Sequence, residues 1–432
     1  MNTKRLEIAR LYHRFGFGPR PGEYANALKI GTEKARTQIL TVPITDAGAN
    51  SISEPPISDL GPRPKPNTAE VIPFAIGMRT QSEQLLLWWL DRMVASDHGL
   101  TERMTWFWHG HWATSITKVN HPLPMYKQNK TFRQNALGDF KSLSRAMIND
   151  GALQYWLDGQ DSTAKSPNEN LARELMELFI LGVGRYSEDD VKSLAKVLTG
   201  YQVRNSSGEV TFNPKRHDAN PVTLLGTRQS FTGESVVDFL VARDDCPQFV
   251  AERLWYRFIS STEPMPTNFS SVKAFSDRNI FSAVTAMASD SAIRDERFAM
   301  VKSPVEWFVS ACRALELVPS KLATPAQLQG YLNKLGQIPF SPPNVGGWPA
   351  GEAWLSSASA QYRIAFATWL VKQSALRPLV DIQEDRRVAQ SADWLGVAQW
   401  SARTQTALRN SINSPQEFVV LALCSPEYVV SA

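Results

Sequence analysis

Four short stretches of one kind limit what this chain of 432 residues can fold into. They are SPNE (Ser166 to Glu169), SPVE (Ser303 to Glu306), TPAQ (Thr324 to Gln327) and SPQE (Ser414 to Glu417). In a capping box, the Ser or Thr side chain and the Glu or Gln side chain each accept a backbone N–H of the other residue, while proline suits the first helical position. Four such helix starts predict a mainly α protein.

Apolar residues recur at helical spacing between these starts. The periodic segments are roughly 4–15, 22–40, 80–96, 126–147, 168–183, 187–199, 246–260, 303–317, 355–373 and 415–430. Two regions differ: residues 43–73 hold seven prolines and predict a Pro-rich excursion, and residues 200–213 alternate around NSSG and predict one small β-hairpin. We therefore expect one large helical bundle, a single domain over residues 1–432.

Composition excludes several classes of function. The formal net charge is only +4 and the basic residues are scattered, which does not fit a nucleic-acid-binding surface. No apolar run approaches the roughly 18 residues of a membrane span, and no nucleotide-binding motif occurs. The N-terminus lacks the pattern of a secretory signal, so a cytoplasmic location is expected.

The stretch WFWHGHWATS, residues 106–115, holds two of the six histidines among three tryptophans. His109 and His111 stand two positions apart, which is about 200° around an α-helix, so one continuous helix would point them in different directions. We expect a helix from about Thr101 to end near His109, with Gly110 as its left-handed C-terminal residue. Both imidazoles could then face one metal ion; the alternative is that they are hydrogen-bonded inside an aromatic core.

A second polar group lies in PNENLARELMELF. Asn170, Arg173, Glu174 and Glu177 fall on one arc of the expected helix, opposite the leucines. This arc is either a solvated surface on which Arg173 separates the carboxylates, or a source of a carboxylate ligand or general base from Glu174 or Glu177. His217, beside Asp218 after the hairpin, could add a third imidazole.

Several long segments resemble a bacterial family of uncharacterised proteins, domain of unknown function eighteen-hundred (DUF1800). The segments are ERMTWFWHGHWATSITKV, MYKQNKTFRQNALGDF, NENLARELMELFILGVGRYSEDDVKSLAKVLTGY, FNPKRHD, VKSPVEWFVSACRAL and LGQIPFSPPNVGGWPAGEAWL. The family motif reads W-H-N-H-F-A-T-S, so Gly110 here replaces Asn and Trp112 replaces Phe. Other positions that match the family are His109, His111, His217, Asn168, Glu169, Asn170, Arg173, Glu174 and Glu177.

The resemblance implies no reaction, because the family has none established. Its members are often exported, and their genes often neighbour those of a sulfatase-like family, domain of unknown function fifteen-hundred-one. A protein of that family is the candidate partner that the resemblance suggests.

Two main hypotheses follow. The first is a metal-dependent enzyme with His109, His111, His217 and Glu174 as ligands of iron, zinc or copper, and with Glu174, Glu177 and Arg173 as catalytic groups. We favour oxidoreductase chemistry for it, with a zinc-type hydrolase as the alternative.

The second hypothesis is a non-catalytic scaffold or maturation partner that presents Trp348 from the loop PPNVGGWPAGEAWL. The opposite interpretation of this loop is that Trp348 and Trp354 pack back on the core. A metal-free hydrolase using His217, Asp218 and Ser115 is a weaker third hypothesis, since no nucleophile motif is present.

Overall fold

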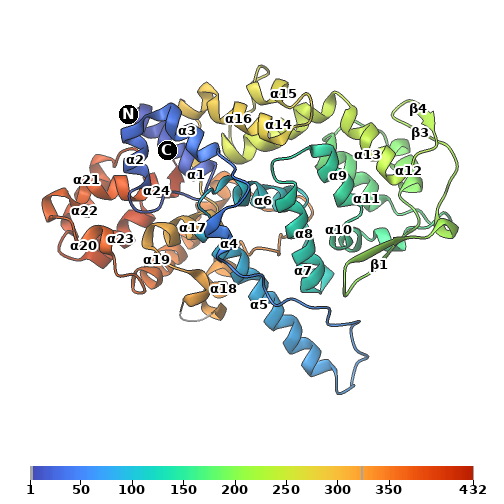
Figure 1. The fold of residues 1–432 in the computed structure, drawn as a ribbon, viewed down its shortest axis with the longest axis horizontal. Helices are drawn as coiled ribbons and strands as arrows, with labels where there is room; N and C mark the ends of the chain where they lie inside the picture. Colours follow the sequence, from blue (N-terminus) through green and yellow to red (C-terminus); the bar gives the residue numbers. More distant parts are fainter. Residues whose placement is uncertain (1–2, 323–324, 432) are drawn as a thin grey trace.

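The computed structural model describes residues 3–322 and 325–431 and is mainly helical (Figure 1). The helices of the N-terminal half are α1 Thr3–Arg14, α2 Glu23–Ile30, α3 Thr32–Leu40, α4 Ala47–Asn50, α5 Val71–Ala95, α6 Leu100–His111, α7 Ile116–Val119, α8 Pro122–Gln134, α9 Phe140–Ile148, α10 Gly151–Trp156, α11 Glu169–Glu174 and α12 Glu188–Val197. Those of the C-terminal half are α13 Gly233–Ala242, α14 Asp245–Phe258, α15 Ser270–Ala274, α16 Ile280–Ser289, α17 Pro304–Leu315, α18 Pro325–Lys334, α19 Ser357–Val371, α20 Arg377–Val380, α21 Glu384–Leu395, α22 Ala402–Asn410, α23 Pro415–Cys424 and α24 Pro426–Val429. One π-helix, η2 Leu175–Ile180, continues α11, and short 3₁₀ turns are η1 Gly159–Asp161, η3 Pro214–Arg216, η4 Ser291–Arg294, η5 Pro319–Lys321 and η6 Gly351–Trp354.

The four expected helix starts differ in outcome. Ser303 and Glu306 form the predicted capping box of α17, and Ser414 precedes α23 without a side-chain capping bond. The prediction at Ser166 is wrong, because Asn168 caps α11 by accepting the N–H of Asn170. Thr324 lies outside the described residues.

Some periodic segments divide into two helices. Residues 22–40 form α2 and α3, which meet at Gly31, and a φ of 92° there breaks the helix. Residues 126–147 divide between α8 and α9, and residues 415–430 between α23 and α24. The apolar period continues through each break because both helices face the same core.

The expected break at Gly110 is wrong. Helix α6 continues through Gly110 to His111, and the N–H of Trp112 still bonds to the carbonyl of Trp108 at 2.8 Å. Burial explains the continuity, since Trp108, His111 and Trp112 are all packed inside the protein and a turn at Gly110 would expose some of them. A C-terminal glycine is a local preference that tertiary packing outweighs here.

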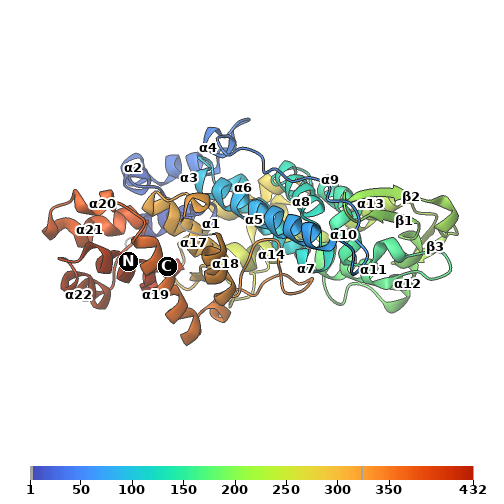
Figure 2. The same ribbon diagram turned by 90° about the horizontal axis from the view of Figure 1, so that it is seen from below.

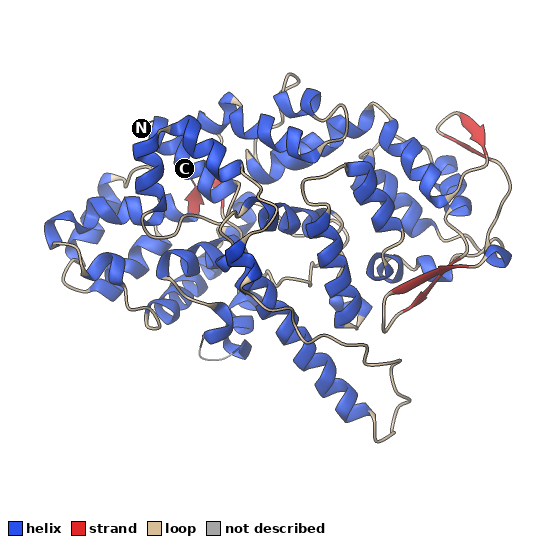
Figure 3. Cartoon of the chain, in the orientation of Figure 1, coloured by secondary structure: helices blue, strands red, loops and turns tan. Residues whose placement is uncertain are grey.

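The strands form short antiparallel pairs, two of them at the end of the molecule far from the chain termini and the third beside the C-terminus (Figure 3). The predicted hairpin is β1 Tyr201–Arg204 with β2 Glu209–Phe212, in which Tyr201 pairs with Phe212. A second hairpin, β3 Val222–Leu224 with β4 Thr227–Gln229, was not expected from the sequence. A third pair joins two segments that are far apart in the sequence, β5 Met300–Val301 and β6 Val430–Ser431.

Two large hydrophobic cores meet at α6. Phe107, Trp108 and Trp112 belong to the core built around α8 to α14 and α16, and Trp106 belongs to the core of α5, α17 to α19 and α21 to α23. Figures 1 and 2 show α6 in the middle of an elongated molecule, with both chain ends near each other toward one end. The residues of WFWHGHWATS therefore join the two halves of the hydrophobic interior.

The proline-rich excursion contains the short helix α4 and otherwise runs in extended and turn conformation to residue 70. It leads into α5, whose C-terminal half is buried and whose N-terminal half extends away from the body (Figure 1). Within residues 3–322 and 325–431, no helix combines the length and the apolar character that crossing a membrane requires.

Candidate functional site

His109 is held as a hydrogen-bond acceptor. It is 1% exposed, and its Nε2 accepts the backbone N–H of Phe340 at 3.0 Å. Because a backbone N–H can only donate, Nε2 carries no proton and the ring is the neutral tautomer protonated at Nδ1. Burial lowers the pKa of His109 to about 3. The lone pair that would bind a metal from Nε2 is thus already occupied.

His111 has the opposite arrangement. Its Nε2 lies 2.9 Å from the carbonyl of Phe179 at the end of the π-helix η2, so Nε2 is the protonated nitrogen. Burial, followed by the charge of Arg253, lowers the pKa of His111 to about 3. Its Nδ1 is buried and has no hydrogen-bond partner. His111 is therefore a neutral imidazole with one unshared lone pair.

The two imidazole rings lie in different surroundings, because residues two positions apart on one helix point in different directions. His109 packs against Trp89, Trp106 and Trp348, whereas His111 packs against Phe107 and Trp108.

His217 is placed elsewhere again. It lies beside Phe212 of the hairpin, and its Nδ1 contacts the hydroxyl and carbonyl of Thr199. In the described part of the chain, no three His, Cys, Asp or Glu side chains are grouped so that they could hold a metal ion.

The polar side chains of α11 form a solvated surface, as one of the two interpretations of the sequence predicts. Both terminal nitrogens of Arg173 bond to Glu188, at 2.7 and 2.8 Å, and one also reaches Glu169. Glu177 accepts the hydroxyl of Tyr186. Glu174 is half-buried, and burial followed by the charge of Glu177 raises its pKa. Arg173 and Glu177 thus pair with neighbouring side chains rather than with the histidines.

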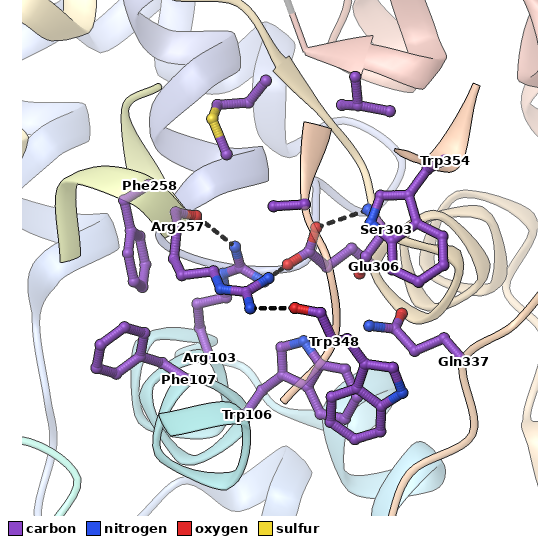
Figure 4. A pocket seen from close by; sticks show the side chains of 14 residues that line it. Arg103, Trp106, Phe107, Arg257, Phe258, Ser303, Glu306, Gln337, Trp348 and Trp354 are labelled. Carbon is purple, nitrogen blue, oxygen red and sulfur yellow. Dashed lines mark hydrogen bonds and ion pairs between the residues drawn. The ribbon is translucent and has the colours of Figure 1, made fainter. Parts of the chain in front are cut away.

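What α6 does bring together is a cleft at the junction of the two cores (Figure 4). It takes side chains from α6, α14, α17 and the loop before η6, which the sequence separates by up to 251 positions, from Arg103 to Trp354. Its enclosed space is about 40 Å³, within a cleft of about 500 Å³ counted to its mouth. The lining residues are Arg103, Trp106, Phe107, Gly110, Arg257, Phe258, Met300, Val301, Ser303, Glu306, Gln337, Trp348, Ala350 and Trp354.

Backbone contact sets the position of the loop that covers α6. A Cβ atom on Gly347 would stand 2.4 Å from the carbonyl oxygen of Gly110, and the φ of Gly347 is 82°. Both observations require glycine at position 347. The loop places Trp348 flat against Trp106, with ring centroids 5.1 Å apart. Trp348 is 4% exposed and Trp354 is 5% exposed, so the interpretation that both pack inward is the correct one.

Arginines dominate the charge of the cleft. Arg103 pairs with Glu306, whose other oxygen accepts the N–H of Ser303 at 2.9 Å. Arg257 donates to the carbonyls of Trp348 and Pro349. Burial, followed by the neighbouring charge of Arg253, lowers the pKa of Arg257 to about 10. Burial thus disfavours the charged form of Arg257, and the charge of Arg253 adds to this effect.

Two indole groups of the cleft lack partners. The Nε1 atoms of Trp348 and Trp354 are buried with no acceptor within hydrogen-bond distance. Trp88, Trp112 and Trp156 share this property but do not line the cleft. Buried N–H groups in proteins are nearly always paired with protein, water or ligand. The walls of the cleft therefore contain two unused indole N–H donors beside a net positive charge.

The sequence indicates two parts of this cleft, the GGWPAGEAW loop and the capping box at Ser303, but nothing in the spacing connects them to Arg103 or Arg257. One signal could have indicated Arg103. In a capping box the glutamate uses one carboxylate oxygen for the backbone N–H, so a buried glutamate such as Glu306 needs a cationic partner for its other oxygen.

Comparison with known proteins gives one match. A family model described as "Protein of unknown function (DUF1800)" matches residues 10–430. No curated protein and no solved structure matches the chain.

Proposed function

Because the chain belongs to the DUF1800 family, whose description names no reaction, we propose from the geometry alone that the protein binds a small acidic molecule in the cleft beside α6. The observation that carries the proposal is the pair of buried, unpartnered indole donors of Trp348 and Trp354 next to Arg257.

Size limits what can be recognised. A water molecule needs roughly 10–15 Å³ of such space, so an enclosed space of about 40 Å³ accepts a group of a few heavy atoms. A carboxylate has this size and presents only acceptors, which suits two indole N–H donors. The wider mouth and the stacked rings of Trp106 and Trp348 would hold the apolar remainder of the molecule.

Charge favours an anion over a neutral acceptor. Arg103 is neutralised by Glu306. Arg257 donates to two backbone carbonyls, and neither Arg253 nor Arg257 forms an ion pair in the described chain. The Nε of Arg253 is also buried without a partner. An anion in the cleft would reduce the repulsion between these two arginines, and this electrostatic gain is larger in a desolvated site than in water.

The test is calorimetric titration of the protein with acetate, propionate and benzoate. We expect benzoate to bind most tightly, because only its ring can pack against the tryptophans. Trp354→Phe should weaken binding roughly tenfold, since a hydrogen bond to a charged group contributes about 1.5–3 kcal/mol.

The matched control is Trp394→Phe. The indole of Trp394 donates to the carbonyl of Ala314 at 2.8 Å and does not line the cleft. This variant should lose stability and keep its affinity. Absence of binding to every carboxylate, or equal loss of affinity in both variants, would refute the proposal.

Metal-dependent chemistry, as an oxidoreductase or a zinc-type hydrolase, stays a hypothesis. Its support in this structure is the unshared lone pair on Nδ1 of His111, which offers one ligand rather than a set. Elemental analysis of protein purified without chelators tests it: about one equivalent of iron, zinc or copper, lost in His111→Ala, would favour it, and less than a tenth of an equivalent would count against it. The sulfatase-like partner remains a prediction, to be tested by co-purification.

A further inference from the structure

The N-terminal half of α5 and the loop before it form an arm, residues 61–80, that extends from the body of the protein (Figures 1 and 3). Residues 71–78 of this arm are eight consecutive residues without a charge or a polar side chain, VIPFAIGM. Ile72 is 70% exposed and Ile76 is 59% exposed. Residues four apart share one helix face, so the two isoleucines form an exposed apolar patch one turn long.

Packing fixes which way this patch faces. Phe74, on the other side of the helix, lies edge-on to the ring of His121, with ring centroids 5.7 Å apart. Farther along α5, Leu85, Trp89 and Met93 are completely buried. The same helix is therefore a core element at its C-terminal end and an exposed apolar element at its N-terminal end. Because the C-terminal half of α5 is fixed in the core, the helix cannot rotate about its axis to bury Ile72 and Ile76.

The charges around the patch are mostly positive. Arg63 and Lys65 are exposed in the proline-rich loop. The side chain of Arg79, one turn beyond Ile76, is 81% exposed and forms an ion pair with Glu83 at 3.6 Å. Glu70 is the one acidic residue among positions 61–80. An apolar tip bordered by basic side chains matches a bilayer surface, where isoleucine enters the acyl boundary and arginine or lysine meets anionic headgroups.

We propose that the arm is a peripheral membrane-docking element that inserts Ile72 and Ile76 into bilayers carrying anionic lipid. Prolines at positions 62, 64 and 66 stiffen the loop that presents Arg63 and Lys65. The arm then acts as a surface anchor rather than a span, and the cleft beside α6 keeps its own ligand.

The experiment is sedimentation of the full chain with phosphatidylcholine vesicles, with and without phosphatidylserine. We expect binding to the vesicles that contain phosphatidylserine and its loss at high salt. The double variant Ile72→Glu/Ile76→Glu should bind at least tenfold more weakly, since each isoleucine loses its apolar transfer. Arg63→Glu/Lys65→Glu should weaken binding roughly fivefold or more, because each basic residue near an anionic surface contributes a factor of about five.

The matched control is Ile364→Glu on α19, where Ile364 is 50% exposed. It should bind vesicles as the wild type does. The proposal is overturned if no vesicle binds, if both lipid mixtures bind equally, or if Ile364→Glu is as defective as the arm variants. It is also overturned if light scattering shows a dimer that Ile72→Glu/Ile76→Glu dissociates while vesicle binding is absent, since the patch would then be a contact between copies.

Discussion

Titratable side chains are buried at the C-terminal end of α6 and face the surface on the polar side of α11. His109 and His111 are enclosed by aromatic rings, and each has one hydrogen bond that fixes its tautomer. Arg173 and Glu177, by contrast, face the surface and pair with Glu188 and Tyr186. The comparison teaches that a motif rich in histidine and glutamate does not specify chemistry until the surroundings of each group are known.

The largest difference should appear on acidification. The pKa values of His109 and His111 fall from 6.5 in the unfolded chain to about 3 in the folded protein. A base with a depressed folded pKa keeps full stability above pH 6.5 and loses it as the pH falls toward 3. We expect the free energy of unfolding to decrease by about 1.4 kcal/mol per pH unit for each histidine, so by roughly 7 kcal/mol for the pair between pH 6.5 and pH 4.

Urea unfolding between pH 7 and pH 4 measures this loss. His109→Asn, which keeps a hydrogen-bond acceptor, should remove close to half of the slope that the pair contributes. Burial also lowers the pKa of His13 well below its ordinary value, so the total slope should exceed two protons. A stability that stays flat between pH 6 and pH 4 would contradict the neutral, enclosed state of both rings.

A mutation at His109 comes next in size. His109→Ala removes a ring packed between Trp89 and Trp348, and it leaves the N–H of Phe340 buried and unpaired. Phe340 has a φ of 66°, a strained conformation for a bulky residue, which this bond helps to hold. We expect a loss of about 3–5 kcal/mol in the free energy of unfolding at pH 7.5.

The control for this variant is His217→Ala, because His217 is half-buried in the loop after the hairpin. A loss of about 1 kcal/mol or less is expected there. Equal losses at the two positions would show that burial does not distinguish them.

The smallest effect should be found on α11. Glu174 is half-buried, and burial followed by the charge of Glu177 raises its pKa, so both effects disfavour its charged form. We expect Glu174→Gln to raise the free energy of unfolding by roughly 0.5 kcal/mol at low salt, measured by urea unfolding. A decrease of more than about 2 kcal/mol in the free energy of unfolding would mean that the Glu174 carboxylate binds a partner. The difference between a solvated face on α11 and enclosed groups on α6 would then be lost.

Much of the fold follows from local rules, because capping residues and apolar period act within a few positions. The start of α17 and the hairpin at residues 201–212 are examples. Gly110 shows where local rules fail: nothing in the sequence near it reveals that the loop at Gly347 presses on its carbonyl. The cleft depends on such distant contacts throughout.

The candidate site was predicted less well than the fold. His109 and His111 were correctly placed within an aromatic interior, but their relation to His217 depends on where the loop after the hairpin runs. Arg257 carried no motif at all, and its importance comes from burial beside Arg253. Charge that is unusual for its surroundings cannot be seen in a sequence.

The π-helix η2 has a further consequence. A π turn contains one residue more than an α turn, so Leu175–Ile180 is equivalent to an α-helix into which one residue has been inserted. The carbonyl of Phe179, which accepts the N–H of His111, lies within this π segment. A one-codon deletion within this segment would restore the regular helix and direct a different carbonyl inward. The contact between η2 and His111 is therefore sensitive to the number of residues in this segment as well as to their type.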